Sequence, residues 1–160
     1  MIRHAGMATL IFLWALISGP AGGLAGNCEP QSFGKVKVRI DDDKLLAEAD
    51  GKALTRDQLP VVGSAWRCLK MRAFPKRRLL FIEWHEGEAG TSQIFHKISL
   101  LAFSVNATGI RPRGSWTLSQ GLRGRGGDIV HAAQTYRLEE SDWSVDVVLT
   151  GTRRVRIEPD

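Results

Sequence analysis

Strict alternation of apolar and polar residues is the feature of this sequence that most restricts its fold. The segment 36–40 alternates valine and isoleucine with basic residues. Apolar residues also occupy every second position from Trp143 to Leu149, and Val155 and Ile157 alternate with Arg154 and Arg156. A period of two residues is typical of a strand with one buried face. The sequence therefore predicts a half-buried strand at 36–40. With a further strand at 130–138, it also predicts a C-terminal antiparallel β-meander over about residues 128–158.

A different periodicity marks the segment before Pro75. Apolar residues recur between Val62 and Ala73 at the intervals of a helical stripe. Thr55 and Gln58 precede them with the spacing of a capping box, in which each side chain bonds to the backbone of the other. This pattern predicts a first helix that Pro75 ends.

The segment 92–107 fits two structures. Ile94, Ile98, Leu101 and Val105 match one face of a helix over three turns, and Gly109 is placed to close it. The same apolar residues also match the long second strand of a hairpin. The length of the stripe favours the helix.

These patterns together predict the fold class. A further strand is expected at 45–49 and ends in a tight turn at Asp50-Gly51. Another is expected at 79–84, a nearly continuous apolar run. The expected fold is α+β: a small mixed sheet with two helices, followed by the C-terminal β-meander and held by one disulfide. With 160 residues, of which 43% are hydrophobic, we expect a single domain over residues 27–160.

The first 26 residues have the composition of a secretory signal peptide. Arg3 and His4 precede the apolar run 8–17, and Pro20 and several small residues follow it. The run is about half as long as a bilayer-spanning helix requires. We expect cleavage and export to a periplasmic or secreted location, with a retained anchor as the alternative and no transmembrane segment after signal removal.

The chain has two cysteines, Cys28 and Cys68. Exported compartments are oxidising, so a disulfide between them is expected. Two buried free thiols are the alternative. Lipidation of Cys28 is a further alternative, although Asn27 is larger than the residue that such processing requires before the cysteine.

Short motifs in residues 34–111 resemble the periplasmic domain of the ExbD/TolR biopolymer-transport proteins. They are Val36-Lys37-Val38, Asp50-Gly51, Thr55 to Leu59, and Thr108-Gly109-Ile110. The resemblance implies an α+β envelope domain with helices beginning near Thr55 and ending near Gly109. No functional residue follows from it, because the family's membrane anchor carries an acidic residue and residues 1–26 here contain none.

Glu83, His85 and Glu86 form the stretch that most suggests catalysis, as general acid and base of a periplasmic hydrolase. Adjacent strand residues point to opposite faces, so His85 and Glu86 are expected to diverge. His85 and His96 in a hairpin turned at 87–90 are expected to lie too far apart to share an ion. We therefore assign no catalytic residue, no metal site and no cofactor.

The remaining candidate is basic surface. Lysine and arginine number 22 against 17 acidic residues, for a net charge of +5. Arginine binds phosphate and carboxylate groups through two parallel hydrogen bonds. The candidate binding residues are Arg77, Arg78, Arg111, Arg113, Arg123 and Arg125. The expected function is a non-enzymatic binding or accessory protein of the bacterial cell envelope. Its partner would be an envelope protein, an anionic glycan or a lipid head group, and no nucleic acid is expected.

Overall fold

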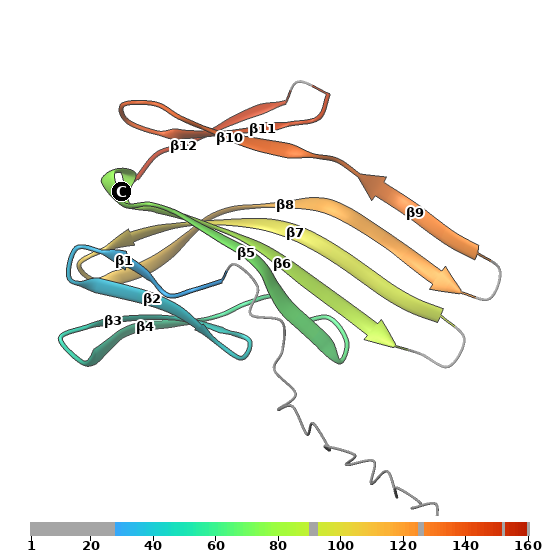
Figure 1. Cartoon of the computed structure of the whole chain (residues 1–160), viewed down its shortest axis with the longest axis horizontal. Helices are drawn as coiled ribbons and strands as arrows, with labels where there is room; N and C mark the ends of the chain where they lie inside the picture. The colour runs from blue at the N-terminus through green and yellow to red at the C-terminus, as the bar shows by residue number, and fades with distance from the viewer. Residues whose placement is uncertain (1–27, 90–92, 125–126, 152, 160) are drawn as a thin grey trace, which may run out of the picture.

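The computed structural model shows a protein built of antiparallel strands (Figure 1). It describes residues 28–89, 93–124, 127–151 and 153–159. The expected signal peptide lies outside these ranges, and no helix within them is long and apolar enough to cross a membrane.

Twelve strands and one short 3₁₀ helix follow one another along the described chain. They are β1 (Gln31–Phe33), β2 (Val36–Asp41), β3 (Lys44–Ala49), β4 (Lys52–Gln58), β5 (Ala65–Phe74), η1 (Pro75–Arg77), β6 (Leu79–Ala89), β7 (Gln93–Asn106), β8 (Gly109–Gly124), β9 (Gly127–Ala133), β10 (Tyr136–Glu140), β11 (Val145–Leu149) and β12 (Arg154–Ile157).

The strands form three sheets stacked as three layers. The N-terminal sheet has the order β1-β2-β3-β4, the central sheet β5-β6-β7-β8-β9, and the C-terminal sheet β10-β11-β12. Every pairing is antiparallel and joins strands that are consecutive in sequence. In Figure 1 the long central strands run between the N-terminal sheet below and the C-terminal sheet above.

Each face of the central sheet packs on its own hydrophobic core. On one face Leu80, Ile82 and Leu101 pack against residues of the N-terminal sheet, such as Val38 and Leu45. On the other face Phe81 and Leu100, with Phe74, Leu79 and Ala102, pack against Val145, Val147 and Ile157 of the C-terminal sheet. A strand covered on both faces has apolar residues at consecutive positions, which explains the run at 79–84.

The expected α+β class is wrong, because both predicted helices are strands. The stripe between Val62 and Ala73 belongs largely to β5, and Thr55 lies within β4 rather than capping a helix. The segment 92–107 is mostly β7, so the hairpin strand was the correct alternative. The helices that the ExbD/TolR resemblance implied for residues 34–111 are therefore absent from the described part of that segment.

Several local predictions agree with the structure. The strand expected at 36–40 is β2 and the one at 45–49 is β3, and Asp50 and Gly51 both adopt the positive φ angles that a tight β3–β4 hairpin turn requires. The expected turn at 87–90 is wrong, since β6 continues to Ala89. The C-terminal meander is real but comprises β10 to β12 alone, because the strand at 127–133 joins the central sheet instead.

The Cys28–Cys68 disulfide is confirmed. Cys68 lies in the edge strand β5 of the central sheet, and Cys28 lies just before β1. The bond therefore ties the start of the N-terminal sheet to the central sheet, beside the core that these two sheets share.

Candidate functional site: a basic groove beside Trp143

Four of the six candidate arginines lie at one end of the central sheet. Arg77 and Arg78 are in the β5–β6 connection, and Arg111 and Arg113 are near the start of β8. Leu79, the residue after Arg78, pairs with Ser104 of β7, which in turn pairs with Arg111. Two strand spacings put Arg111 about 10 Å from Leu79 across the sheet.

Of the other two candidates, only Arg123 can be placed, and it lies away from this group. Arg123 lies twelve residues beyond Arg111 on β8, which is about 40 Å along an extended strand. Arg125 lies outside the described residues. The described backbone therefore separates Arg123 from the four arginines at the sheet end.

A groove of about 260 Å³ is open at the end that holds Arg77 and Arg78. It is lined by Lys76, Arg77, Arg78, Asp142, Trp143 and Pro159. The side chain of Trp143 is 82% exposed, the highest value among the large apolar residues that the structure describes as exposed. We call this feature the basic groove.

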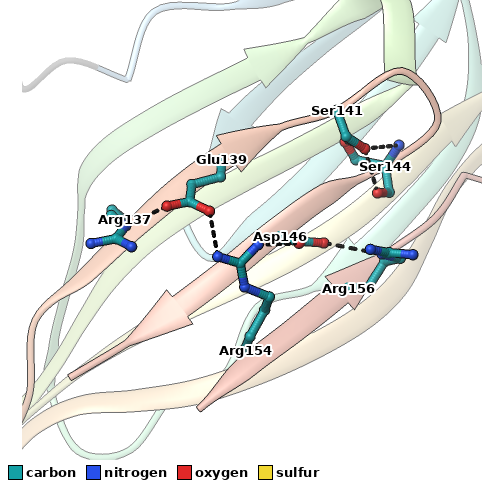
Figure 2. Close-up of polar contacts among 7 residues, drawn as sticks. All are labelled: Arg137, Glu139, Ser141, Ser144, Asp146, Arg154 and Arg156. Carbon is teal, nitrogen blue, oxygen red and sulfur yellow. Dashed lines mark hydrogen bonds and ion pairs between the residues drawn. The ribbon is translucent and has the colours of Figure 1, made fainter. Parts of the chain in front are cut away.

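Trp143 is exposed because a tight polar turn presents it. The Ser141 amide donates a hydrogen bond to the Ser144 carbonyl at 2.9 Å. The Ser144 amide donates to Ser141 Oγ at 3.2 Å, and the two hydroxyl groups lie 2.8 Å apart (Figure 2). These contacts close the β10–β11 turn, so Trp143 stands outside the alternation that buries Val145 and Val147.

The basic wall of the groove is also fixed by the backbone. Pro75 begins η1, and Arg78 ends it with φ = 51°. The Arg78 amide donates to the Pro75 carbonyl at 3.2 Å, and the Arg78 carbonyl accepts a hydrogen bond from the Val105 amide at 2.8 Å. These bonds hold Lys76, Arg77 and Arg78 in a short turn at the sheet end.

Arg77 connects the two sides of the groove. Its Nε donates to the Ser141 carbonyl at 2.6 Å and lies 3.5 Å from Glu140 Oε1. Lys76 and Arg78 are exposed and form no ion pair with the other described residues. The positive charges of Lys76 and Arg78 are partly offset by the negative charge of Asp142 in the groove lining, and the remainder is available to a ligand.

A second basic surface, on the outer face of the C-terminal sheet, has three arginines whose charges are largely offset by ion pairs with two carboxylates. Arg154 bridges Glu139 at 2.8 Å and Asp146 at 3.0 Å, while Arg156 contacts Asp146 at 3.3 Å and Arg137 pairs with Glu139 (Figure 2). Asp146 is nearly buried beneath these arginines. These ion pairs link the strands of the C-terminal sheet to one another. The basic groove is therefore the stronger candidate for a binding site.

The candidate hydrolase residues do not share one site. Glu86 is fully buried on the face of β6 that carries Trp84, whereas Glu83 and His85 lie on the opposite face. Tyr136 donates a hydrogen bond to Glu83. Burial and the charges of Arg67 and His96 lower the pKa of His85. A hydrolase would have to act through Glu83 and His85 without Glu86.

His85 and His96 are closer than expected from the sequence. His85 pairs with Ile98 and His96 pairs with Gly87, so the histidines are diagonal neighbours on β6 and β7. No group of three metal-ligating side chains occurs in the described part of the chain.

Comparison with known proteins assigns the chain to no family. No family model matches the chain, and neither the curated proteins nor the solved structures contain a significant match.

Proposed function

We propose that the protein is an exported, non-enzymatic binding protein of the bacterial cell envelope that holds an anionic polymer in the basic groove. The observation that carries this proposal is Trp143, 82% exposed and adjacent to three consecutive cationic residues. A tryptophan that a soluble protein leaves uncovered costs free energy in water unless a ligand covers it.

The groove matches anions that also offer an apolar surface. Lys76 and Arg78 supply positive charge, and the guanidinium of Arg78 can hold a carboxylate or phosphate through two hydrogen bonds. The indole of Trp143 supplies a flat apolar face. Acidic glycans and lipid phosphate head groups combine these properties, and an envelope protein with an acidic surface is the alternative partner.

Two features support export. Residues 1–26 have the pattern of a signal peptide. The Cys28–Cys68 disulfide is of a kind that persists in oxidising compartments.

The proposal is tested by measuring binding of residues 27–160 to polygalacturonate and to phosphatidylglycerol vesicles at low and high salt. Binding to at least one is expected, weaker at high salt because exposed charges are screened. Trp143→Ala should weaken binding about thirtyfold, the effect of losing about 2 kcal/mol at a central contact. Stability should not change, since the side chain is exposed.

The charge test is the double variant Lys76→Glu/Arg78→Glu. This variant should abolish binding. The control is Arg56→Glu/Arg67→Glu, which changes the net charge by the same amount at exposed positions away from the groove and should retain most of the binding. Equal losses in both variants would mean that net charge alone governs binding. Such a result, or the absence of wild-type binding to both polygalacturonate and the vesicles, would contradict the proposal.

A further inference from the structure

A second cavity lies between the central and C-terminal sheets, away from the basic groove. It measures about 500 Å³ and is lined by side chains that include Glu83, Ile98, Leu118, Gln134, Tyr136 and Thr150. None of these residues lines the basic groove. The volume falls within the range of small-molecule sites, about 300–1,000 Å³.

One wall of this cavity is apolar. Leu118 is buried in the core between the two sheets, and Ile98 and Tyr136 pack at the border of the same core. A ligand that reaches this wall must present a face of carbon–hydrogen groups.

The polar groups around the cavity are already partly bonded to one another. Tyr136 donates its hydroxyl proton to Glu83 Oε1, and Gln134 Nε2 donates to the Thr117 carbonyl. The hydroxyl groups of Thr135 and Thr150 lie 2.7 Å apart. These contacts use the Tyr136 hydroxyl donor and one of the two N–H groups of Gln134, and they hold the side chains in place.

The unused hydrogen-bonding capacity includes two acceptors, together with the second N–H of Gln134 and the Ser119 hydroxyl. Glu83 Oε2 and Gln134 Oε1 accept no hydrogen bond from the residues that the structure describes. A ligand with hydroxyl or amide donors could supply hydrogen bonds to these two oxygens.

The local charge selects against ionic ligands. Lys70 of β5 is the direct cross-strand partner of Glu83, so a basic residue shares the face of the sheet that carries this carboxylate, and an added cation gains less than it would at an isolated carboxylate. An anionic ligand would meet the Glu83 carboxylate. A neutral donor-bearing molecule is favoured.

We propose that this cavity binds one pyranose ring of an uncharged sugar. Ring hydroxyl groups would donate to Glu83 Oε2 and Gln134 Oε1, while the carbon–hydrogen face of the ring would pack on Ile98 and Leu118. This site goes beyond the proposed function and does not depend on it, because the basic groove contributes no residue to it.

The test is an amide NMR titration of residues 27–160 with methyl glucoside, methyl galactoside and methyl N-acetylglucosaminide. At least one should shift the amides of Ile98, Leu118 and Tyr136 with a Kd of about 1–10 mM, the strength that roughly a dozen non-hydrogen atoms supply. Glu83→Gln should weaken that binding about tenfold or more, since a charged acceptor is lost. Glu88→Gln, a matched change at an exposed position of β6, should leave it unchanged.

A second variant, which fills the cavity, keeps the test decisive if Glu83→Gln fails to fold. Ser119 lines the cavity, and Ser119→Arg should block sugar binding while the remaining amide spectrum stays native. Three results would overturn the proposal: no amide shift at the cavity with any of the sugars, full binding by both variants, or tighter binding of a simple alkylamine than of the sugars.

Discussion

The carboxylate of Glu86 is completely buried, and Oε2 lies 3.8 Å from Nζ of Lys97, the residue directly opposite on β7. Neither carboxylate oxygen accepts a hydrogen bond from the described residues. The Lys97 ammonium is therefore the counter-charge that the structure shows for this carboxylate. A buried charge is tolerated when it is paired and is costly when it is not.

Replacing Lys97 alone should destabilise the fold. Lys97→Met keeps the length of the side chain but leaves the Glu86 carboxylate unpaired, so the free energy of unfolding should fall by about 3 kcal/mol. Urea denaturation followed by circular dichroism measures this change.

The double variant Glu86→Leu/Lys97→Met provides the decisive comparison. It removes both charges together, so its stability should lie within about 1 kcal/mol of the wild type. Lys37→Met, at an exposed position of β2, should change stability by less than about 0.5 kcal/mol. A Lys97→Met variant as stable as the Lys37 control would contradict the pairing.

The sequence predicts strands correctly where one face is buried and at the short apolar run 79–84, but it fails along the longer strand β7, which is buried on both faces. In β2 the exposed side chain of Lys37 separates the buried Val36 and Val38, so the period of two is visible. In β7 Leu100 faces the C-terminal sheet and Leu101 faces the N-terminal sheet. Consecutive apolar residues of this kind also contain helical spacings, which is why β7 was predicted as a helix.

An irregularity explains the same error in β5. The pairing of β5 with β6 shifts register between Cys68 and Lys70. The extra residue, Leu69, interrupts the alternation, so Trp66, Leu69 and Ala73 fall three and four residues apart. Local spacing cannot reveal a bulge, because the partner strand defines it.

Less of the candidate site was predictable. The basic residues from Lys76 to Arg78 stand together in the sequence, and two of them, Arg77 and Arg78, are among the candidate binding residues that the sequence suggests. Trp143 was assigned to a strand face, whereas the hydrogen-bonded turn between Ser141 and Ser144 presents it outside the sheet. Trp143 and Arg78 line the same groove although they are 65 positions apart in the sequence. No local sequence pattern encodes such a long-range arrangement.

Tyr136 should titrate at unusually high pH. Burial and the hydrogen bond to the Glu83 carboxylate raise its pKa above the usual 10.0. Tyr136 is the only tyrosine in the chain, so near-ultraviolet phenolate absorbance reports on it alone. The absorbance of the folded protein should rise only well above pH 10, and that of the urea-unfolded protein near pH 10.

The same shift makes stability depend on alkaline pH. The unfolded tyrosine loses its proton first, so stability should decline as pH rises above 10. Glu83→Gln should bring the pKa of Tyr136 closer to 10, and Tyr136→Phe should weaken the alkaline decline. A native titration midpoint at 10 in the wild type would contradict the buried hydrogen bond.

His85 should titrate below the usual value of 6.5. Burial, Arg67 and His96 lower its pKa, in that order of importance. Since the unfolded chain then takes up a proton before the folded one, stability should decline as pH falls below about 6.5. Arg67→Met should raise the pKa of His85, as NMR of the imidazole signals against pH would show. An unchanged His85 midpoint in that variant would rule out the proximity of Arg67.

The disulfide should account for much of the stability. Cys28 and Cys68 are 40 positions apart, and closing a loop of that length stabilises by about 4 kcal/mol in the chain-entropy description. The double variant Cys28→Ser/Cys68→Ser should lose about this amount in urea denaturation without reductant. The wild type with reductant should lose a similar amount, whereas reductant should not affect the variant. A reductant effect of equal size in the variant would show that the measured loss does not come from this bond.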